Sequence, residues 1–262
     1  MIPRRKIITS VGTFASIGLV GTVSGQDQSD SQKQNESDNN LREQILTAHK
    51  INGREAVERL FENKGLAYET TTSTLEDARP DDSDVGAENR YSESNSELNL
   101  YLNSIPDHSD RARLTVIVDL DTVRYRPRGR KSIYVDDAIG IGFDGNHWSV
   151  VGEPILNATV HEAQWHSNSL KDGGLAGVVE LQRSMVTIPS DGGSVALEGV
   201  FQNLDNVAGT LWGSYEHTRA WAPSGAISSI EGGAGPISVD LSSSASTAWE
   251  LADNVDPSSV LG

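Results

Sequence analysis

The sequence predicts a mainly β protein, an antiparallel β-sandwich preceded by a short helical hairpin over 41–65. Apolar and polar residues alternate through most of 175–221, which is the pattern of strands with two different faces. Asp-Gly and Gly-Gly turns recur between such runs, and no strand–helix–strand alternation predicts a parallel sheet. We therefore expect one extended domain over 41–262, with two β domains meeting near Gly152 as the alternative.

The helical hairpin is predicted by two capping boxes. Asn40 and Asn52 are each followed three residues later by a glutamate, the spacing that opens a helix. Apolar residues recur at helical spacing after each cap, and Gly65 is expected to end the second helix. His49 lies on the apolar stripe of the first helix, where we expect a packed structural histidine and not a ligand.

The segment before the hairpin resembles a twin-arginine export signal followed by a linker. Arg4 and Arg5 precede apolar residues, a glycine-diluted apolar stretch and small residues up to Gly25. The resemblance implies a cleaved signal peptide over 1–25, no stable membrane span afterwards, folding before export, and a secreted or extracellular-surface location; an uncleaved anchor is the alternative. Residues 26–40 contain no apolar side chain, which predicts a disordered polar linker.

The composition indicates a halophilic protein, with an ordinary acidic mesophilic protein as the alternative. The chain has 37 acidic against 21 basic residues, a formal net charge of −16, and no cysteine. An acidic, lysine-poor surface stays hydrated when salt screens charge. In its leader and its acidic, lysine-poor composition, the chain resembles exported proteins of halophilic archaea. No family-specific motif in the sequence indicates a function. The charge argues against nucleic acid as the main partner, and the lack of cysteine excludes disulfides, thiolate metal sites and a cysteine nucleophile.

The strands of the first half are predicted from alternation and turn residues, over 66–74, 97–104, 112–125 and 137–152. In the last of these, the run Asp144-Gly145-Asn146 has the chemistry of a tight β-hairpin turn. Gly140 and Gly142 alternate with large apolar residues, so we expect a bulky group such as Trp148 to cover the glycine face.

A basic island is the first candidate binding site. Pro127 and Gly129 place its middle in a turn. It would bind an anion: a polyanionic glycan, a cell-envelope component or the acidic face of another protein. The alternative is a solvated turn whose arginines pair with the protein's own acids. The candidate residues are Arg124, Arg126, Arg128, Arg130 and Lys131.

The second candidate lies in the strand predicted over 211–221. Tyr215, His217 and Arg219 share one face there, placing an acid–base group beside an anion-holding group. No nucleophile motif, carboxylate pair or phosphate loop accompanies them, so no catalytic residue, metal or cofactor is predicted. Polar side chains at every second position are also the pattern of the solvated face of a sheet.

Together these observations favour a secreted or cell-surface binding protein over an enzyme. Its expected partner is a glycan, an envelope component or another protein. The alternatives are a secreted hydrolase with a cleft around His217 and a secreted antagonistic or immunity-type factor. Asn35 and Asn157 begin N-glycosylation patterns, which suit an exported chain.

Overall fold

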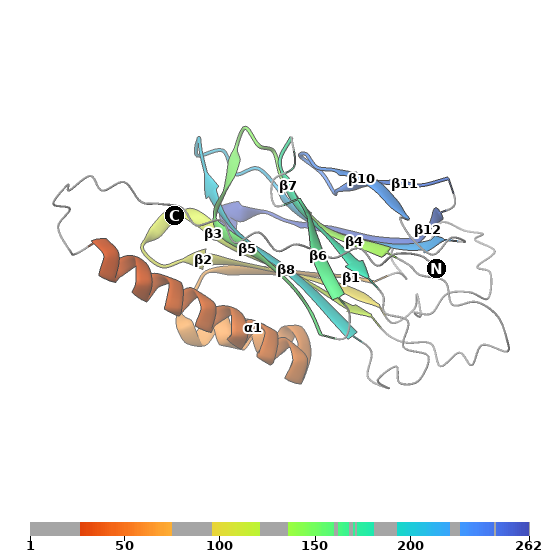
Figure 1. Cartoon of the computed structure of the whole chain (residues 1–262). Coiled ribbons are helices and arrows are strands. Elements are labelled where there is room, and N and C mark those ends of the chain that lie inside the picture. The colour runs from red at the N-terminus through yellow and green to blue at the C-terminus, as the bar shows by residue number, and fades with distance from the viewer. Residues whose placement is uncertain are drawn as a thin grey trace, which may run out of the picture. The chain divides into compact units, whose positions relative to one another are not determined.

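A computed structural model describes residues 27–74, 96–120, 136–159, 162–167, 170, 172–180, 193–220, 226–243 and 245–261 (Figure 1). The leader with Arg4 and Arg5 and the basic island over 124–131 lie outside these ranges. The chain divides into two compact units, 1–46 and 47–262. Within the described ranges, no helix is both long and apolar enough to cross a membrane.

Helix α1 (Asp27–Lys64) is one element and not the predicted hairpin, although two helices are merged in it across a kink. Its dihedral angles leave the helical region at Asn52 and Gly53, where Gly53 adopts a φ of 61°. The kink falls on the residues where the sequence places the turn between the two predicted helices. The helix ends as predicted at Gly65, whose N–H donates to the carbonyl of Glu62 at 3.0 Å.

The start of α1 overlaps the segment 26–40 that composition predicts to be a disordered linker. The helix includes this segment from Asp27 onward. The segment contains neither glycine nor proline, the two residues that disfavour a helix most, but it is rich in Ser, Asp and Asn, which are weak helix formers. Composition therefore gives no physical account of the helix in this segment.

In the part of the chain that the structure describes, twelve strands follow α1, and alternation located most of them within a few residues. Their bounds are β1 Tyr68–Thr74, β2 Glu97–Ile105, β3 His108–Leu120, β4 Asp136–Gly142, β5 Trp148–Ala158, β6 Glu162–Ser167, β7 Gly174–Glu180, β8 Gly193–Asn203, β9 Leu211–Ala220, β10 Ile227–Glu231, β11 Ser238–Leu241 and β12 Ala245–Val255. A short 3₁₀ helix, η2 Pro257–Ser259, comes last.

Ten of these strands form two five-stranded antiparallel sheets. Sheet 1 has the order β1-β2-β3-β8-β5, and sheet 2 has the order β12-β9-β4-β7-β6. Apolar side chains of both sheets form one buried core, with Leu100 and Val116 from sheet 1 and Ile139 from sheet 2. The sheets approach closely, because a Cβ atom on Gly213 of β9 would lie 3.0 Å from both Leu100 and Val116. The predicted mainly β, antiparallel sandwich is thereby confirmed.

The turn over 144–146 is present, but it does not form the predicted hairpin. Strand β4 pairs with β7 and β9, whereas β5 pairs with β8, so this turn passes the chain from sheet 2 to sheet 1. The side chain of Asp144 shapes the turn by accepting the N–H of Asn146 at 2.8 Å. Local turn chemistry was readable from the sequence, whereas the partners of the two flanking strands were not.

The glycine face of β4 is covered by the β10–β11 ribbon, that is, the two strands and the segment 232–237 that joins them, and the prediction that Trp148 covers this face is wrong. A Cβ atom on Gly140 would lie 2.5 Å from Ile237, and one on Gly142 would lie 1.9 Å from the carbonyl oxygen of Gly235. Small residues in β4 therefore let a second layer of chain approach the outer surface of sheet 2. This layer closes a second small core of Ala138, Leu170, Ala176, Ile230 and Ile237.

Candidate functional site

Two of the three predicted site residues of β9, Tyr215 and His217, lie in the core and not on a solvated face. Tyr215 and His217 point between the sheets, and His217 is only 2% exposed. The polar residues on the other side of β9 are covered too, because Ser214, Glu216 and Thr218 are also buried. The interpretation that one face of this strand is solvated is therefore wrong for 214–218 of β9. Arg219 pairs in register with Ser246 of β12, and its side chain lies outside the description.

Buried Asp137 holds the polar groups of β9 together. Its Oδ2 atom accepts a hydrogen bond from the Tyr215 hydroxyl and lies 2.8 Å from Nδ1 of His217, while its Oδ1 accepts the N–H of Thr218 at 3.0 Å. The His217 ring also packs on Trp249, with ring centroids 4.9 Å apart. A buried carboxylate is tolerated when several donors surround it. An acid–base pair is thus present, but it is closed off from a substrate.

His49 of α1 has the structural role that its place on the apolar stripe predicts. Its Nδ1 atom lies 2.7 Å from the Tyr101 hydroxyl, and its Nε2 atom lies 2.6 Å from Oδ2 of Asp119. Burial of the phenol, with a smaller contribution from the Asp119 carboxylate, raises the pKa of Tyr101 well above its ordinary value. The three side chains join the helix to the outer face of sheet 1.

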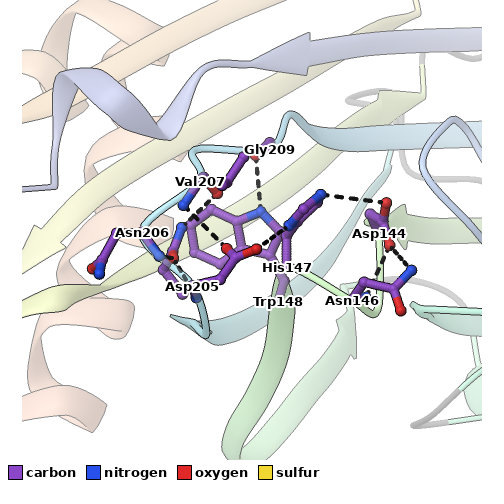
Figure 2. A network of polar contacts seen from close by, with 9 residues as sticks. Asp144, Asn146, His147, Trp148, Asp205, Asn206, Val207 and Gly209 are labelled. Atoms are coloured by element: carbon purple, nitrogen blue, oxygen red, sulfur yellow. Dashed lines mark hydrogen bonds and ion pairs between the residues drawn. The ribbon is translucent and has the colours of Figure 1, made fainter.

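A rigid loop between β8 and β9 is the stronger candidate site, and Figure 2 shows the contacts that hold it. Three hydrogen bonds tie this loop to the β4–β5 turn. Nδ1 of His147 lies 2.6 Å from Oδ2 of Asp205, and the Trp148 indole donates to the carbonyl of Gly209 at 2.9 Å (Figure 2). The N–H of Leu204 also donates to the carbonyl of His147 at 2.9 Å. Two segments about sixty residues apart in sequence are therefore fixed to each other.

Asn203 organises the loop from within. Its side-chain oxygen accepts the N–H groups of Asp205 at 3.2 Å and Asn206 at 2.6 Å, and its amide donates to the carbonyl of Val207 at 2.8 Å. Asn206 adopts a φ of 60°, a conformation that asparagine tolerates better than most residues. The loop backbone is thus held by side-chain bonds in place of a sheet ladder.

This loop exposes two aliphatic side chains, which the sequence reasoning missed. Leu204 is 54% exposed and Val207 is 49% exposed. The signal in the sequence is an isolated leucine and valine inside a run of turn-forming Asn and Asp residues. A turn needs no such aliphatic side chains, so their presence there is a signal that the sequence reasoning could have used.

The loop also carries negative charge. The hydrogen bond from the His147 ring, and after it the N–H of Val207, lower the pKa of the exposed Asp205 carboxyl below its ordinary value. Asp144 lies on the other side of the same ring, with Oδ2 3.8 Å from Nε2 of His147 (Figure 2). Among the residues that the structure describes, no group of three or more His, Asp or Glu side chains could hold a metal ion.

One predicted glycosylation site lies on a described surface. Asn157 is exposed on β5, an outer strand of sheet 1. The hydroxyl of Thr159, the third residue of the pattern, accepts the N–H of Ser194 at 3.0 Å. The side chain of Asn35 is outside the description, so glycosylation stays a prediction at both positions.

Comparison with known proteins gives only distant likenesses. No family model matches the sequence, and no curated protein is similar to it. A collagen-binding domain of a Staphylococcus aureus adhesin shares 7% identity over 58% of this chain and 91% of that domain, with a TM-score of 0.29. A structure concerned with pH-induced modulation of Streptococcus parasanguinis adhesion by Fap1 fimbriae shares 13% over 73% of this chain and 98% of that one, with a TM-score of 0.32.

A third likeness is to the KRT10-binding region domain of the pneumococcal serine-rich repeat protein PsrP. It shares 11% identity over 68% of this chain and 97% of that domain, with a TM-score of 0.27. Identities and TM-scores of this size assign neither a family nor a ligand to the chain.

Proposed function

We propose that the protein is a secreted or cell-surface binding protein and that the loop over 204–207 is its binding site. One observation carries this proposal: Leu204 and Val207 are about half exposed on a loop whose backbone is fixed by side-chain hydrogen bonds. Neither side chain contributes its full apolar area to the core. A binding partner that covers them gains that area without the entropy cost of ordering the loop.

The acid–base groups of the described strands support binding over catalysis. Asp137 and His217 form an acid–base pair, but both side chains are buried between the sheets. A general base must reach its substrate directly or through a single water molecule. The location outside the cell rests on the twin-arginine-like leader, and the basic island over 124–131 remains a second predicted contact.

A retention experiment in high salt tests this function. The protein lacking its leader is immobilised and incubated with cell-envelope fractions and glycan arrays of a halophilic archaeon. The double variant Leu204→Ser/Val207→Ser should retain its ligand at least about tenfold more weakly, which corresponds to about 1.4 kcal/mol. Ile51→Ser is the matched control, because Ile51 is an aliphatic side chain 75% exposed on α1. Absence of retention by the unaltered protein, or equal loss in both variants, would overturn the proposal.

A further inference from the structure

The His147 ring lies between two carboxylates that come from different parts of the chain (Figure 2). Its Nδ1 atom lies 2.6 Å from Oδ2 of Asp205 in the β8–β9 loop, and its Nε2 atom lies 3.8 Å from Oδ2 of Asp144 in the β4–β5 turn. Asp172, in the turn before β7, contacts the β4–β5 turn through its backbone carbonyl, which accepts the N–H of Gly145 at 3.4 Å. Its side chain is exposed, and no third carboxylate of a described residue forms an ion pair with the ring.

Each of the two aspartates uses its other oxygen to shape its own turn. Oδ1 of Asp144 accepts the N–H of Asn146 at 2.8 Å, and Oδ1 of Asp205 accepts the N–H of Val207 at 3.1 Å. Both bonds reach two residues along the chain, which is the pattern of an Asx turn. In both turns Oδ2 is left to face the His147 ring. The ring therefore joins two carboxylates that are each fixed to the backbone beside them.

The number of hydrogen-bond donors on the ring depends on its charge. A neutral imidazole has one N–H group, whereas an imidazolium has two. A neutral ring can donate to Asp205 through Nδ1, but its Nε2 atom then has no proton to direct toward Asp144. A protonated ring presents an N–H to both sides and adds charge attraction to both contacts. The contact with Asp144 is too long for a hydrogen bond, so it acts through this charge.

We propose that the charge of His147 regulates the loop over 204–207, with the ring forming a latch between Asp144 and Asp205 that is strongest when it is protonated. This inference rests on the function proposed for the loop. Histidine side chains change charge between about pH 5 and 8. Asp205 stays ionised there, because its pKa lies below its ordinary value. The latch therefore contributes fully at the acid end of this range and is lost as pH rises through it.

The latch acts on the residues that the proposed function needs. Leu204 precedes Asp205 in the chain, and the N–H of Val207 is bonded to the same carboxylate that the ring holds. Weakening the hold on Asp205 therefore loosens the backbone that presents both exposed aliphatic side chains. A partner that binds a looser loop must also order it, and this ordering weakens binding.

The expected effect is small, because the latch is one of several ties. The N–H of Leu204 donates to the carbonyl of His147, and the Trp148 indole donates to the carbonyl of Gly209. Neither bond depends on the charge of the ring. The His147 side chain is 31% exposed, so water and salt screen its ion pairs. Raising the pH should therefore loosen the loop about two- to fivefold without releasing it.

Amide hydrogen exchange on the ligand-free full chain in high salt tests the latch itself. Protection of the N–H groups of Leu204 and Val207 is compared at about pH 5.5 and about pH 8.5, on the two sides of the histidine range, after correction for the intrinsic effect of pH on exchange. Protection should be about two- to fivefold higher at the lower pH. Equal protection at both pH values would overturn the proposal.

Variants assign the pH effect to one ring. His147→Asn replaces Nδ1 by a neutral amide donor, so its loop protection should be the same at both pH values. His166→Asn alters an exposed histidine of β6 and should keep the pH dependence of the unaltered chain. The N–H groups of β3, a central strand of sheet 1, report whether the whole fold changes with pH. A pH dependence that persists in His147→Asn, or that β3 shares, would reject the latch.

Retention of cell-envelope fractions of a halophilic archaeon, measured at the same two pH values, separates this inference from the proposed function. The unaltered chain should retain its ligand about two- to fivefold more strongly at the lower pH, and His147→Asn should show no such difference. Absence of retention at both pH values would overturn the proposed function, and hydrogen exchange would then decide on the latch alone. Equal retention at both pH values would overturn the regulation and leave the proposed function standing.

Discussion

Nδ1 of His217 lies 2.8 Å from Oδ2 of Asp137, and both side chains are buried between the two sheets. The two residues are 80 positions apart in sequence, so the contact joins β4 to β9 across long-range pairing. Removing one partner of a buried charge-bearing pair leaves the other without its donor or acceptor. The contact therefore makes specific predictions about stability.

His217→Ala should lower the free energy of unfolding by about 3–5 kcal/mol, because it leaves the Asp137 carboxylate buried with one donor fewer. Urea denaturation in high salt, followed by circular dichroism, measures the change. His166→Ala, which alters an exposed histidine of β6, is the control and should change stability by less than about 0.5 kcal/mol. Similar losses in both variants would contradict a structural role specific to His217.

Gly142→Ala should destabilise the protein by about 1–3 kcal/mol through overpacking. The new Cβ atom would fall 1.9 Å from the carbonyl oxygen of Gly235, so the backbone of the β10–β11 ribbon must move. Gly233→Ala is the matched control, because no atom lies within 4 Å of the Cβ position there. Thermal unfolding compares the two, and an unchanged midpoint for Gly142→Ala would show that the ribbon does not press on β4.

Glu216→Gln should stabilise the protein at neutral pH by about 0.2–1 kcal/mol. Burial of its carboxyl, with the neighbouring Glu250 and Asp137 carboxylates, raises the pKa of Glu216 in the folded state, despite a hydrogen bond from Thr247. Stability from this group is therefore present below the ordinary pKa of glutamate and is lost as pH rises through the raised value.

The Glu216 prediction is checked by measuring unfolding between about pH 4 and pH 7, a range that runs from near the ordinary pKa of glutamate upward. The glutamine variant should lose less stability than the unaltered protein as pH rises. Glu153→Gln, which changes an exposed acid, should leave the slope unchanged. A steeper loss in Glu216→Gln would reverse the sign and reject the argument.

His147→Ala should raise the pKa of Asp205 toward its ordinary value, because the ring bond is the largest cause that lowers it. A depressed carboxyl pKa stabilises the loop above the ordinary pKa of aspartate, and the contribution is lost as pH falls through the folded-state value. Carbon-13 NMR of the carboxyl resonance measures both values directly. An identical pKa in the two proteins would show that the ring does not bond to Asp205 in solution.

Alternation located the strands well where one residue in two faces a continuous core. The prediction over 97–104 matches β2, and the run up to Trp221 contains β9, because Leu100 and Tyr215 point between the sheets. The same pattern misled for the other face of β9, since a second layer of chain covers Ser214 there. Alternation shows that the two faces of a strand differ, but it does not show whether the polar face is exposed or buried.

The candidate site was less predictable than the fold. Asp137 could not be assigned to His217 from the sequence, because the contact depends on β4 and β9 being neighbours. The sequence predicts only a turn over 205–208 in this loop, whose aliphatic side chains carry the proposed function. Pairing between distant strands brings these groups together, and local patterns hold no record of it.

The pairing of β3 with β8 joins distant parts of the chain. Leu114 at the middle of β3 is in register with Gly199, so sheet 1 cannot be completed until the chain through β8 has been made. Closing the chain between β3 and β8 costs conformational entropy before the contacts between these strands can form. Proteins rich in contacts between residues distant in sequence therefore fold slowly. A chain exported in the folded state, as its leader predicts, would need to wait in the cytoplasm for this closure. For such a chain, assembly of the sandwich would have to precede transport.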